Sequence, residues 1–287
     1  MTIQQLTTQL TADLQVIYPA PEAQAIAALV VEHLLEMSAL QRRMQAVAPV
    51  PAAVLAQLPA LRARLLAHEP VQYVLGVAHF AGLELEVTPA TLIPRPETEE
   101  LLRLVETENP GGRAGQPLRV LDVGTGSGCL AIGLARAWPR AQVRAVDVSA
   151  AALAVARRNA ARYAPTVEFE ELDILAQKPA LAPASLDVLV SNPPYVRRSE
   201  QAQMRPNVLA WEPTTALFVP DDDPLVFYRR LAALGQELLR LGGGIYLEIN
   251  EALGTETRML LQQQGYEQVE VRMDIFGRPR FVSGKVP

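Results

Sequence analysis

The segment Leu121-Asp122-Val123-Gly124-Thr125-Gly126-Ser127-Gly128 carries the fold prediction, because an apolar strand there runs into a turn with three glycines. The strand is expected over Leu118–Val123 and a helix over Leu130–Trp138. Glycines between a strand and a helix permit a tight turn and let a ligand approach the backbone closely. This order predicts an α/β protein with a ligand site at its first strand–helix turn.

Strands and helices continue to alternate after this turn, which is the pattern of an α/β fold. Further strands are predicted at Gln142–Asp147, Val167–Leu172, Leu186–Val190 and Gly244–Ile249, with a final pair at Gln268–Met273 and Arg280–Ser283. Helices are predicted at Glu97–Glu106, Ala150–Tyr163, Pro224–Leu239 and Glu256–Gln264. The glycine- and proline-rich stretch Asn109–Pro117 is expected to be a connecting loop.

Residues 1–75 are expected to form a separate helical domain. Apolar side chains recur at helical spacing in Ala23–Met37. A second such stretch, Ala52–His68, is expected to be interrupted at Pro59, because proline marks turns between helices. This domain is either a structural cap or a module that recognises a partner, and the sequence leaves both alternatives open.

Residues 76–90 are expected to form a β-hairpin linker between two domains. The runs Val71–Val77 and Leu83–Val87 are β-prone. The dipeptide Ala81-Gly82, which lies between them directly before the second run, is typical of a turn. The α/β domain is therefore expected to span residues 91–287.

Composition places the chain among soluble globular proteins. Of its 287 residues, 49% are apolar and 20% are charged, which fits one large domain or two. Lysine and arginine number 26 against 31 acids, and this net charge of −5 argues against nucleic acid as the main partner. The single cysteine, Cys129, excludes an internal disulfide, and the three histidines have no metal-ligand spacing. Because we find neither a secretion signal nor an apolar run of about 18 residues, we expect a cytoplasmic protein with no metal and no membrane span.

The glycine turn and the acids that follow later strands limit which ligands the site can bind. The dinucleotide fingerprint needs glycine or alanine where this chain has Cys129, and no Gly-Lys-Ser/Thr follows as a P-loop requires. Asp147 ends the second strand, where a carboxylate can accept both hydroxyls of an adenosine ribose, since Ser149 is the better helix cap. Asp173 either meets the adenine amino group or is a solvated turn acid. An adenosine without polyphosphate is thus expected, and S-adenosyl-L-methionine (SAM) fits it.

The tetrad Asn192-Pro193-Pro194-Tyr195 follows the fourth strand, beside the glycine turn. A planar NH₂ group is a poor nucleophile with two hydrogen-bond donors, so a site that methylates it needs two acceptors. The Asn192 side-chain oxygen and the Pro193 carbonyl can supply them, and Tyr195 offers a ring against which a planar group can stack. Asn-Pro also occurs in plain turns, but its place after a strand favours in-line methyl transfer that needs no strong base.

In these residues the chain resembles the HemK/PrmC-type protein methyltransferases, which methylate the glutamine of the Gly-Gly-Gln loop in class I peptide-chain release factors. The resemblance is strongest from Glu69 to Tyr195. Its narrowest signals are Glu69-Pro70-Val71-Gln72-Tyr73-Val74-Leu75-Gly76 and Thr91-Leu92-Ile93-Pro94-Arg95-Pro96-Glu97-Thr98-Glu99. Other matching positions are Asn159, Glu212-Pro213, Leu247-Glu248-Ile249 and Gly277-Arg278-Pro279-Arg280-Phe281.

The resemblance implies a class I methyltransferase fold, which is a Rossmann-like seven-stranded sheet whose last strand is antiparallel, behind a smaller helical N-terminal domain that recognises substrate. It implies SAM as the methyl donor, S-adenosyl-L-homocysteine as the product and class I release factors as the protein substrate. Cofactor contacts are implied for Gly124, Thr125, Gly126, Ser127, Gly128, Asp147, Asp173, Ile174 and Asn192. Ile174 stands where some relatives place an aromatic residue near the adenine.

The resemblance also implies which residues hold the glutamine. The catalytic and substrate-binding residues are expected to be Asn192, Pro193, Pro194 and Tyr195. Arg95 is expected either to help close the pocket or to form an ion pair with Glu97 or Glu99. The loop Val196–Asp223 is expected to shape substrate access.

Two other classes of function remain open from the sequence. The tetrad also occurs in enzymes that methylate adenine or guanine amino groups, and the same lineage includes a methyltransferase that acts on a ribosomal-protein glutamine. A SAM fold can also serve as a binding module without activity, although the unbroken glycine turn, Asp147 and tetrad argue against that.

Overall fold

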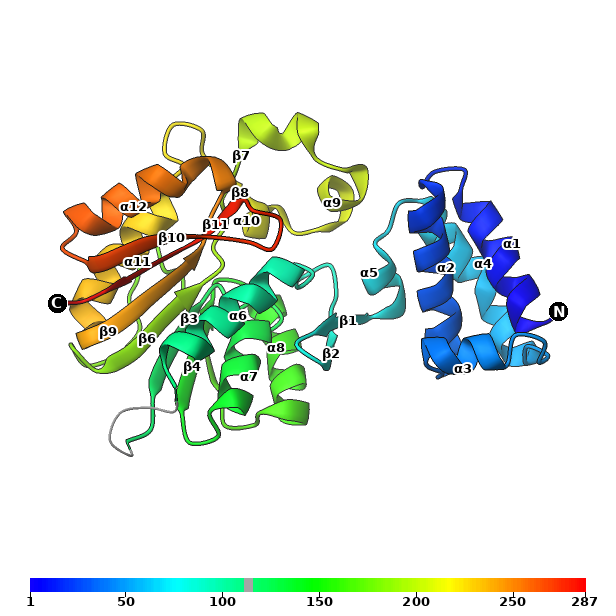
Figure 1. Cartoon of the computed structure of the whole chain (residues 1–287), viewed down its shortest axis with the longest axis horizontal. Helices are drawn as coiled ribbons and strands as arrows, with labels where there is room; N and C mark the ends of the chain where they lie inside the picture. The colour runs from blue at the N-terminus through cyan, green and yellow to red at the C-terminus, as the bar shows by residue number, and fades with distance from the viewer. Residues whose placement is uncertain (111–115) are drawn as a thin grey trace. The chain divides into compact units, whose positions relative to one another are not determined.

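The computed structural model describes residues 1–110 and 116–287. The centre of the predicted loop Asn109–Pro117, residues 111–115, lies outside the described residues. The chain forms two compact units, Met1–Val77 together with Arg205–Trp211, and Ala78–Met204 together with Glu212–Pro287. Figure 1 shows that the first unit is helical and that the second contains a sheet with helices on both faces. Within the two described ranges, no helix is long and apolar enough to cross a membrane.

The first unit is a bundle of helices, two of which begin at capping boxes. Its helices are α1 (Ile3–Leu14), α2 (Ala20–Leu34), α3 (Ala39–Met44), α4 (Ala52–Leu66), α5 (Val71–Leu75) and α9 (Pro206–Trp211). Thr2 and Ser38 cap α1 and α3 and satisfy backbone N–H groups that a helix start leaves unpaired. Leu10 and Leu14 of α1 share a buried core with Val30 of α2, as their helical spacing requires.

The predicted interruption at Pro59 is wrong, because α4 continues through this residue to Leu66. Proline in a helix interior removes one backbone hydrogen bond. Alanine and leucine, which favour helices, dominate both sides of Pro59, and Val54 and Leu65 bury the two ends of the helix. Tertiary packing at both ends therefore outweighs the local cost.

The β-prone run that begins at Val71 is also a wrong prediction, because it forms helix α5. Gly76 ends this helix in the left-handed conformation, with φ of 74°. The Arg64 guanidinium donates to the backbone carbonyls of Tyr73 and Val74, at 3.0 Å each. A partner from another helix thus satisfies carbonyls at the helix end, which local β-propensity does not register.

The second unit is built on a seven-stranded mixed sheet. The strand order is β10 (Glu267–Met273), β11 (Pro279–Lys285), β9 (Leu239–Glu248), β6 (Leu186–Ser191), β3 (Arg119–Val123), β4 (Gln142–Asp147) and β5 (Glu168–Glu171). The last strand, β11, is antiparallel to both of its neighbours, whereas β9, β6, β3, β4 and β5 are parallel. The predicted α/β fold, with seven strands and an antiparallel last strand, is therefore confirmed.

Helices cover both faces of this sheet (Figure 1). The helices α6 (Pro96–Glu108), α7 (Cys129–Ala137) and α8 (Ala150–Tyr163) pack in one apolar core, and α11 (Val226–Leu238) and α12 (Gly254–Gln263) pack in the other. The hairpin of β1 (Val77–Phe80) and β2 (Leu83–Glu86) buries Phe80, Leu83 and Leu85 in the first of these cores. The predicted linker hairpin is thus an integral part of the second unit.

The stretch Val196–Asp223, predicted as a loop, contains short regular elements. They are β7 (Val196–Arg197), the 3₁₀ helix η1 (Arg198–Gln203), α9, α10 (Thr214–Leu217) and β8 (Phe218–Val219), and β7 pairs with β8. Its middle part belongs to the first unit, where Arg205 contacts both carboxylate oxygens of Glu22 at 3.0 Å. Trp211 donates there from its indole nitrogen to the carbonyl of Ala67 at 3.3 Å.

Candidate active site

The glycine turn lies at the carboxyl end of β3, directly beside the end of β4. The N–H groups of Gly124 and Thr125 donate to the carbonyl of Val146 at 2.9 and 3.1 Å. The N–H of Gly126 donates to Asp147 Oδ2 at 2.8 Å. Gly126 has a φ of +56°, and a Cβ built on it meets nothing within 4 Å. The turn is therefore held against β4 while it leaves open space on its other side.

Asp147 holds the turn and the following helix at the same time. Its Oδ1 accepts from the N–H of Ser149 at 2.9 Å, and the Ser149 hydroxyl oxygen accepts from the N–H of Ala152 at 3.1 Å. Ser149 is thus the cap of α8, as predicted. Burial raises the pKa of Asp147. Asp147 is therefore not the cap, although Oδ2 accepts the N–H of Gly126 and Oδ1 that of Ser149; each oxygen keeps a lone pair for a ligand hydroxyl.

The tetrad lies next to the glycine turn because β6 is the neighbour of β3. Ser191, at the end of β6, is in register with Val123, and its hydroxyl donates to the Val123 carbonyl at 2.6 Å. A Cβ on Gly124 would lie 3.9 Å from the backbone oxygen of Asn192. Residues that are 68 positions apart in the chain therefore face one cavity.

This cavity collects most of the predicted site residues. It is lined by Gly124, Thr125, Gly126, Ser127, Asp147, Asp173, Ile174, Asn192, Pro193 and Pro194. Gly128, Tyr195 and Arg95 do not line it. Asp173 is exposed and its Oδ1 accepts from the N–H of Leu175 at 3.0 Å, whereas Ile174 is buried.

Several apolar walls of the cavity were missing from the sequence prediction. They include Leu92, Pro94, Pro213, Phe227 and Leu231. Leu92, Pro94 and Pro213 stand inside segments that carried the family resemblance, so a signal for them existed. Phe227 and Leu231 lie on α11, where their helical spacing predicts burial but gives no hint of a cavity.

Gly128 instead has a packing position at the start of α7. A Cβ there would lie 3.0 Å from Ile132 Cδ1 and 3.3 Å from Ala156 Cβ. Nearby, the Asn159 amide donates to the carbonyls of Ser127 and Glu86, each at 3.0 Å. Asn159 thus ties the glycine turn to strand β2.

Arg95 forms an ion pair with Glu212, so the expected pair with Glu97 or Glu99 is wrong. The Glu212 carboxylate is buried, and its other oxygen accepts from the N–H of Ile93 at 3.2 Å. Glu212 therefore joins the Pro94 wall of the cavity to the Pro213 wall, across 117 positions of sequence.

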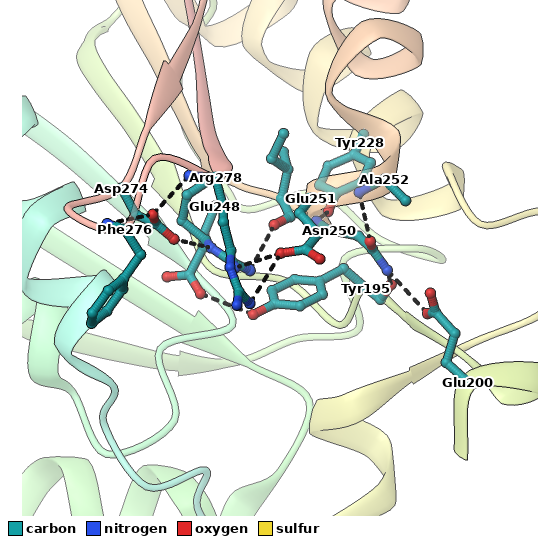
Figure 2. Close-up of polar contacts among 12 residues, drawn as sticks. Tyr195, Glu200, Tyr228, Glu248, Asn250, Glu251, Ala252, Asp274, Phe276 and Arg278 are labelled. Atoms are coloured by element: carbon teal, nitrogen blue, oxygen red, sulfur yellow. Dashed lines mark hydrogen bonds and ion pairs between the residues drawn. The ribbon is translucent and has the colours of Figure 1, made fainter. Parts of the chain in front are cut away.

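The Asn192 side chain is oriented by a partner from α6. Its Nδ2 donates to Thr98 Oγ1 at 3.1 Å, and Thr98 Oγ1 donates to Glu248 Oε2 at 2.8 Å. The Tyr195 hydroxyl donates to the other Glu248 oxygen, Oε1, at 3.0 Å, as Figure 2 shows. Because the Asn192 NH₂ group is used by Thr98, its side-chain oxygen is left as the acceptor.

Glu248 is a buried carboxylate at the end of β9, only 1% exposed. Burial raises its pKa to about 7, and the two hydroxyl donors oppose that shift. The next residue but one, Asn250, donates to the carbonyl of Tyr195 at 3.1 Å and so fixes the last residue of the tetrad (Figure 2). Thr98 and Glu248 were not among the predicted site residues, although an acid within the apolar stretch Gly244–Ile249 was a visible signal.

Two family models match the chain. One, described as the PrmC N-terminal domain, matches residues 5–76, and another, described as the methyltransferase small domain, matches residues 100–210. A release factor glutamine methyltransferase of Bacteroides thetaiotaomicron is 44% identical over 97% of this chain and 98% of its own. A second, of Flavobacterium psychrophilum, is 43% identical over 76% of each chain.

The chain belongs to the release factor glutamine methyltransferase family. Its fold is similar to that of a solved methyltransferase from Pyrococcus furiosus, which superposes with a TM-score of 0.52, at 18% identity, over 78% of this chain and 96% of that one. The family is one of methyltransferases, and it implies SAM as the methyl donor.

The residues of this family member fit that cofactor. The space over Gly126 is where a side chain would otherwise stand, and Asp147 keeps acceptor capacity beside it. Apolar walls such as Ile174 and Phe227 suit an adenine ring. Within the part of the chain that the structure describes, no group of three His, Cys, Asp or Glu side chains could hold a metal ion.

Proposed function

We propose that this protein transfers the methyl group of SAM to the side-chain amide nitrogen of the glutamine in the Gly-Gly-Gln motif of class I peptide-chain release factors. The observation that carries the proposal is the orientation of Asn192. Its NH₂ group is taken by Thr98, which leaves its oxygen to accept from a substrate amide. The names of the relatives support a release factor as the substrate.

One half of the cavity binds the cofactor. Asp147 accepts the ribose hydroxyls with its remaining lone pairs, and the turn Gly124–Ser127 cradles the amino-acid end. Asp173 faces the adenine amino group, and Ile174 forms part of the adenine wall. When bound, SAM supplies an electrophilic methyl group on a sulfonium, and the product is S-adenosyl-L-homocysteine.

The glutamine half supplies oxygens and excludes other donors. The two N–H groups of the substrate amide donate to Asn192 Oδ1 and to the Pro193 carbonyl, so the nitrogen lone pair is left to face the methyl. Pro193 and Pro194 have no N–H to compete for these oxygens, and their fixed φ keeps the carbonyls in place. Tyr195, which does not line the cavity, acts indirectly by holding the end of the tetrad in place through its contacts with Glu248 and Asn250.

The chemistry then depends on positioning and polarisation and not on a strong base. Acceptors on both N–H groups increase electron density on the nitrogen, and this interaction strengthens as positive charge develops there. Holding the amide in line with the methyl removes much of the entropic cost of the reaction. The amide proton leaves during or after transfer.

The protein recognises its partner through segments outside the cavity. The helical domain, residues 1–75, takes part in recognising the release factor, and Arg95 helps to shape the entrance used by the glutamine. The protein acts in the cytoplasm, where release factors work, and uses no metal.

A substrate panel tests the proposal. Labelled SAM is offered with a release factor, with the same factor carrying Gln→Ala in its Gly-Gly-Gln motif, with ribosomal proteins and with nucleic acid. We expect label on the unmodified factor alone. Label on a ribosomal protein or a nucleic acid, with none on the factor, would reverse the assignment, and absence of label on every substrate would favour a binding module.

A further inference from the structure

We propose that Thr98 and Glu248 are positioning residues that set which way the Asn192 amide faces, through the relay of hydrogen bonds Glu248–Thr98–Asn192. The inference rests on the proposed function, since it explains how that site acquires its acceptor. It names two residues on α6 and β9, outside the tetrad: Thr98 acts on methyl transfer through Asn192, and Glu248 acts through Thr98 and Tyr195.

An asparagine amide needs a hydrogen-bond partner that fixes its orientation. Its oxygen and its NH₂ group have nearly the same size, so packing alone does not choose between the two orientations. Turned the wrong way, Asn192 would present two donors to a substrate that itself offers two donors. The tetrad would then repel the amide that it is built to hold.

The hydroxyl of Thr98 alone could not solve this problem. A hydroxyl carries one donor and two lone pairs, and it rotates to suit its partner. It could therefore accept from the Asn192 NH₂ group or, after rotation, donate to the Asn192 oxygen. Direction must come from a group that can only accept or only donate.

Glu248 supplies that direction when it is ionised, because a carboxylate only accepts. It takes the Thr98 hydroxyl hydrogen at 2.8 Å, so Thr98 has only lone pairs left for Asn192 at 3.1 Å. Its second oxygen is occupied by the Tyr195 hydroxyl at 3.0 Å. One carboxylate thus aligns both polar side chains of the tetrad (Figure 2 shows the Tyr195 contact).

Burial makes this alignment effective. Thr98 is 2% exposed and Glu248 is 1% exposed, so water does not offer alternative partners. A buried carboxylate without donors is costly, which keeps both hydroxyls turned toward it. The neighbouring Arg280 guanidinium, held by Asp274 at 3.3 Å, favours the ionised form of Glu248.

The test uses matched variants of Thr98 in the full chain. Thr98→Val keeps the shape and removes the hydroxyl, whereas Thr98→Ser keeps the hydroxyl and removes a methyl group. We expect Thr98→Val to lower kcat by about 10- to 100-fold, somewhat less than loss of a direct stabilising contact. Thr98→Ser is expected to recover most of that loss, and the Kd for SAM in both variants to stay within about threefold of wild type.

A control and a second variant complete the experiment. Thr257 on α12 is also buried, and its hydroxyl oxygen has no hydrogen-bond partner, so Thr257→Val measures the effect of the same chemical change away from the site. We expect it to leave kcat unchanged. Glu248→Gln is expected to lower kcat as Thr98→Val does, because an amide can donate and no longer dictates the direction of the Thr98 hydroxyl.

The outcomes separate this inference from the proposed function. A folded Thr98→Val enzyme with wild-type kcat, or a Thr98→Ser enzyme as slow as Thr98→Val, would overturn the relay. A loss of SAM binding as large as the loss of kcat would also overturn it, since the residues would then act on the cavity as a whole. Failure of the wild-type enzyme to methylate the release factor would instead contradict the proposed function.

Discussion

The two halves of the cavity are built in different ways. In the cofactor half, Asp147 holds the N–H of Gly126 only 21 positions away, and most of the contacts involve backbone at the ends of neighbouring strands. In the glutamine half, Asn192 depends on Thr98, 94 positions away, and Tyr195 depends on Glu248, 53 positions away. A strand end places a backbone turn without help, whereas a side-chain amide needs a partner to face the right way.

The largest expected effect on kcat comes from a substitution that disrupts the glutamine half alone. Asn192→Ala removes the side-chain oxygen that accepts from the substrate amide, and we expect kcat for release-factor methylation to fall by more than about 100-fold. SAM binding, measured by calorimetry, is expected to stay within about threefold, because the turn and Asp147 are untouched. Normal turnover in this variant would falsify the assignment of the tetrad as an amide clamp.

The next largest effect, on the Kd for SAM, is expected from a substitution that disrupts the cofactor half alone. Asp147→Asn replaces a double acceptor that serves Gly126 and Ser149 with a group that has one oxygen. We expect the Kd for SAM to rise about 10- to 100-fold, as for loss of hydrogen bonds to a charged acceptor. The kcat at saturating SAM should change much less. A variant that binds SAM normally would show that the ribose acid lies elsewhere.

A smaller effect on kcat is expected from pH. Burial raises the pKa of Glu248 to about 7, and only the ionised form directs both hydroxyls. The ionised fraction rises with pH, so kcat should rise through about pH 7 and be about a tenth of its plateau at pH 6. The charged or titratable groups that face Glu248 are Arg280 from β11, Glu97 from α6, Tyr228 from α11, Cys129 from α7 and Tyr195 of the tetrad.

The pH experiment compares wild type with Glu248→Gln. The variant cannot ionise at this position, so its lower kcat should lack the inflection near pH 7. SAM binding measured over the same range serves as the control for the titration of Asp147, whose pKa is also raised. An unchanged inflection in Glu248→Gln would assign the titration to another group.

The smallest expected effect concerns the entrance walls. Arg95→Met removes the ion pair with Glu212, which links the segments that carry Pro94 and Pro213. Because the arginine is partly exposed, solvent weakens this pair, and we expect only a rise of about three- to tenfold in KM for the release factor. Arg103→Met, on the exposed side of α6, is the matched control and should behave as wild type. Equal effects of the two changes would remove any special role for Arg95.

Sequence patterns located most of the regular elements because their signals are local. The α/β alternation, the glycine turn, the cap at Ser149 and the tetrad each depend on neighbours in the chain, and the strand β4 and helix α8 have their predicted bounds. The wrong predictions, at Pro59 and in the run after Val71, arose where packing or a distant side chain overrode local propensity.

What the sequence by itself determined is the set of groups that stand at strand ends, since β-strand order and chain direction bring Gly124–Ser127, Asp147 and Asn192 to one edge of the sheet. What only the tertiary structure decided is how those groups are turned. The partners of Asn192 and Arg95 come from segments about a hundred positions away, and no periodicity records such a contact. The physical reason is that a hydrogen bond between side chains depends on the packing of whole elements, which the local sequence does not contain.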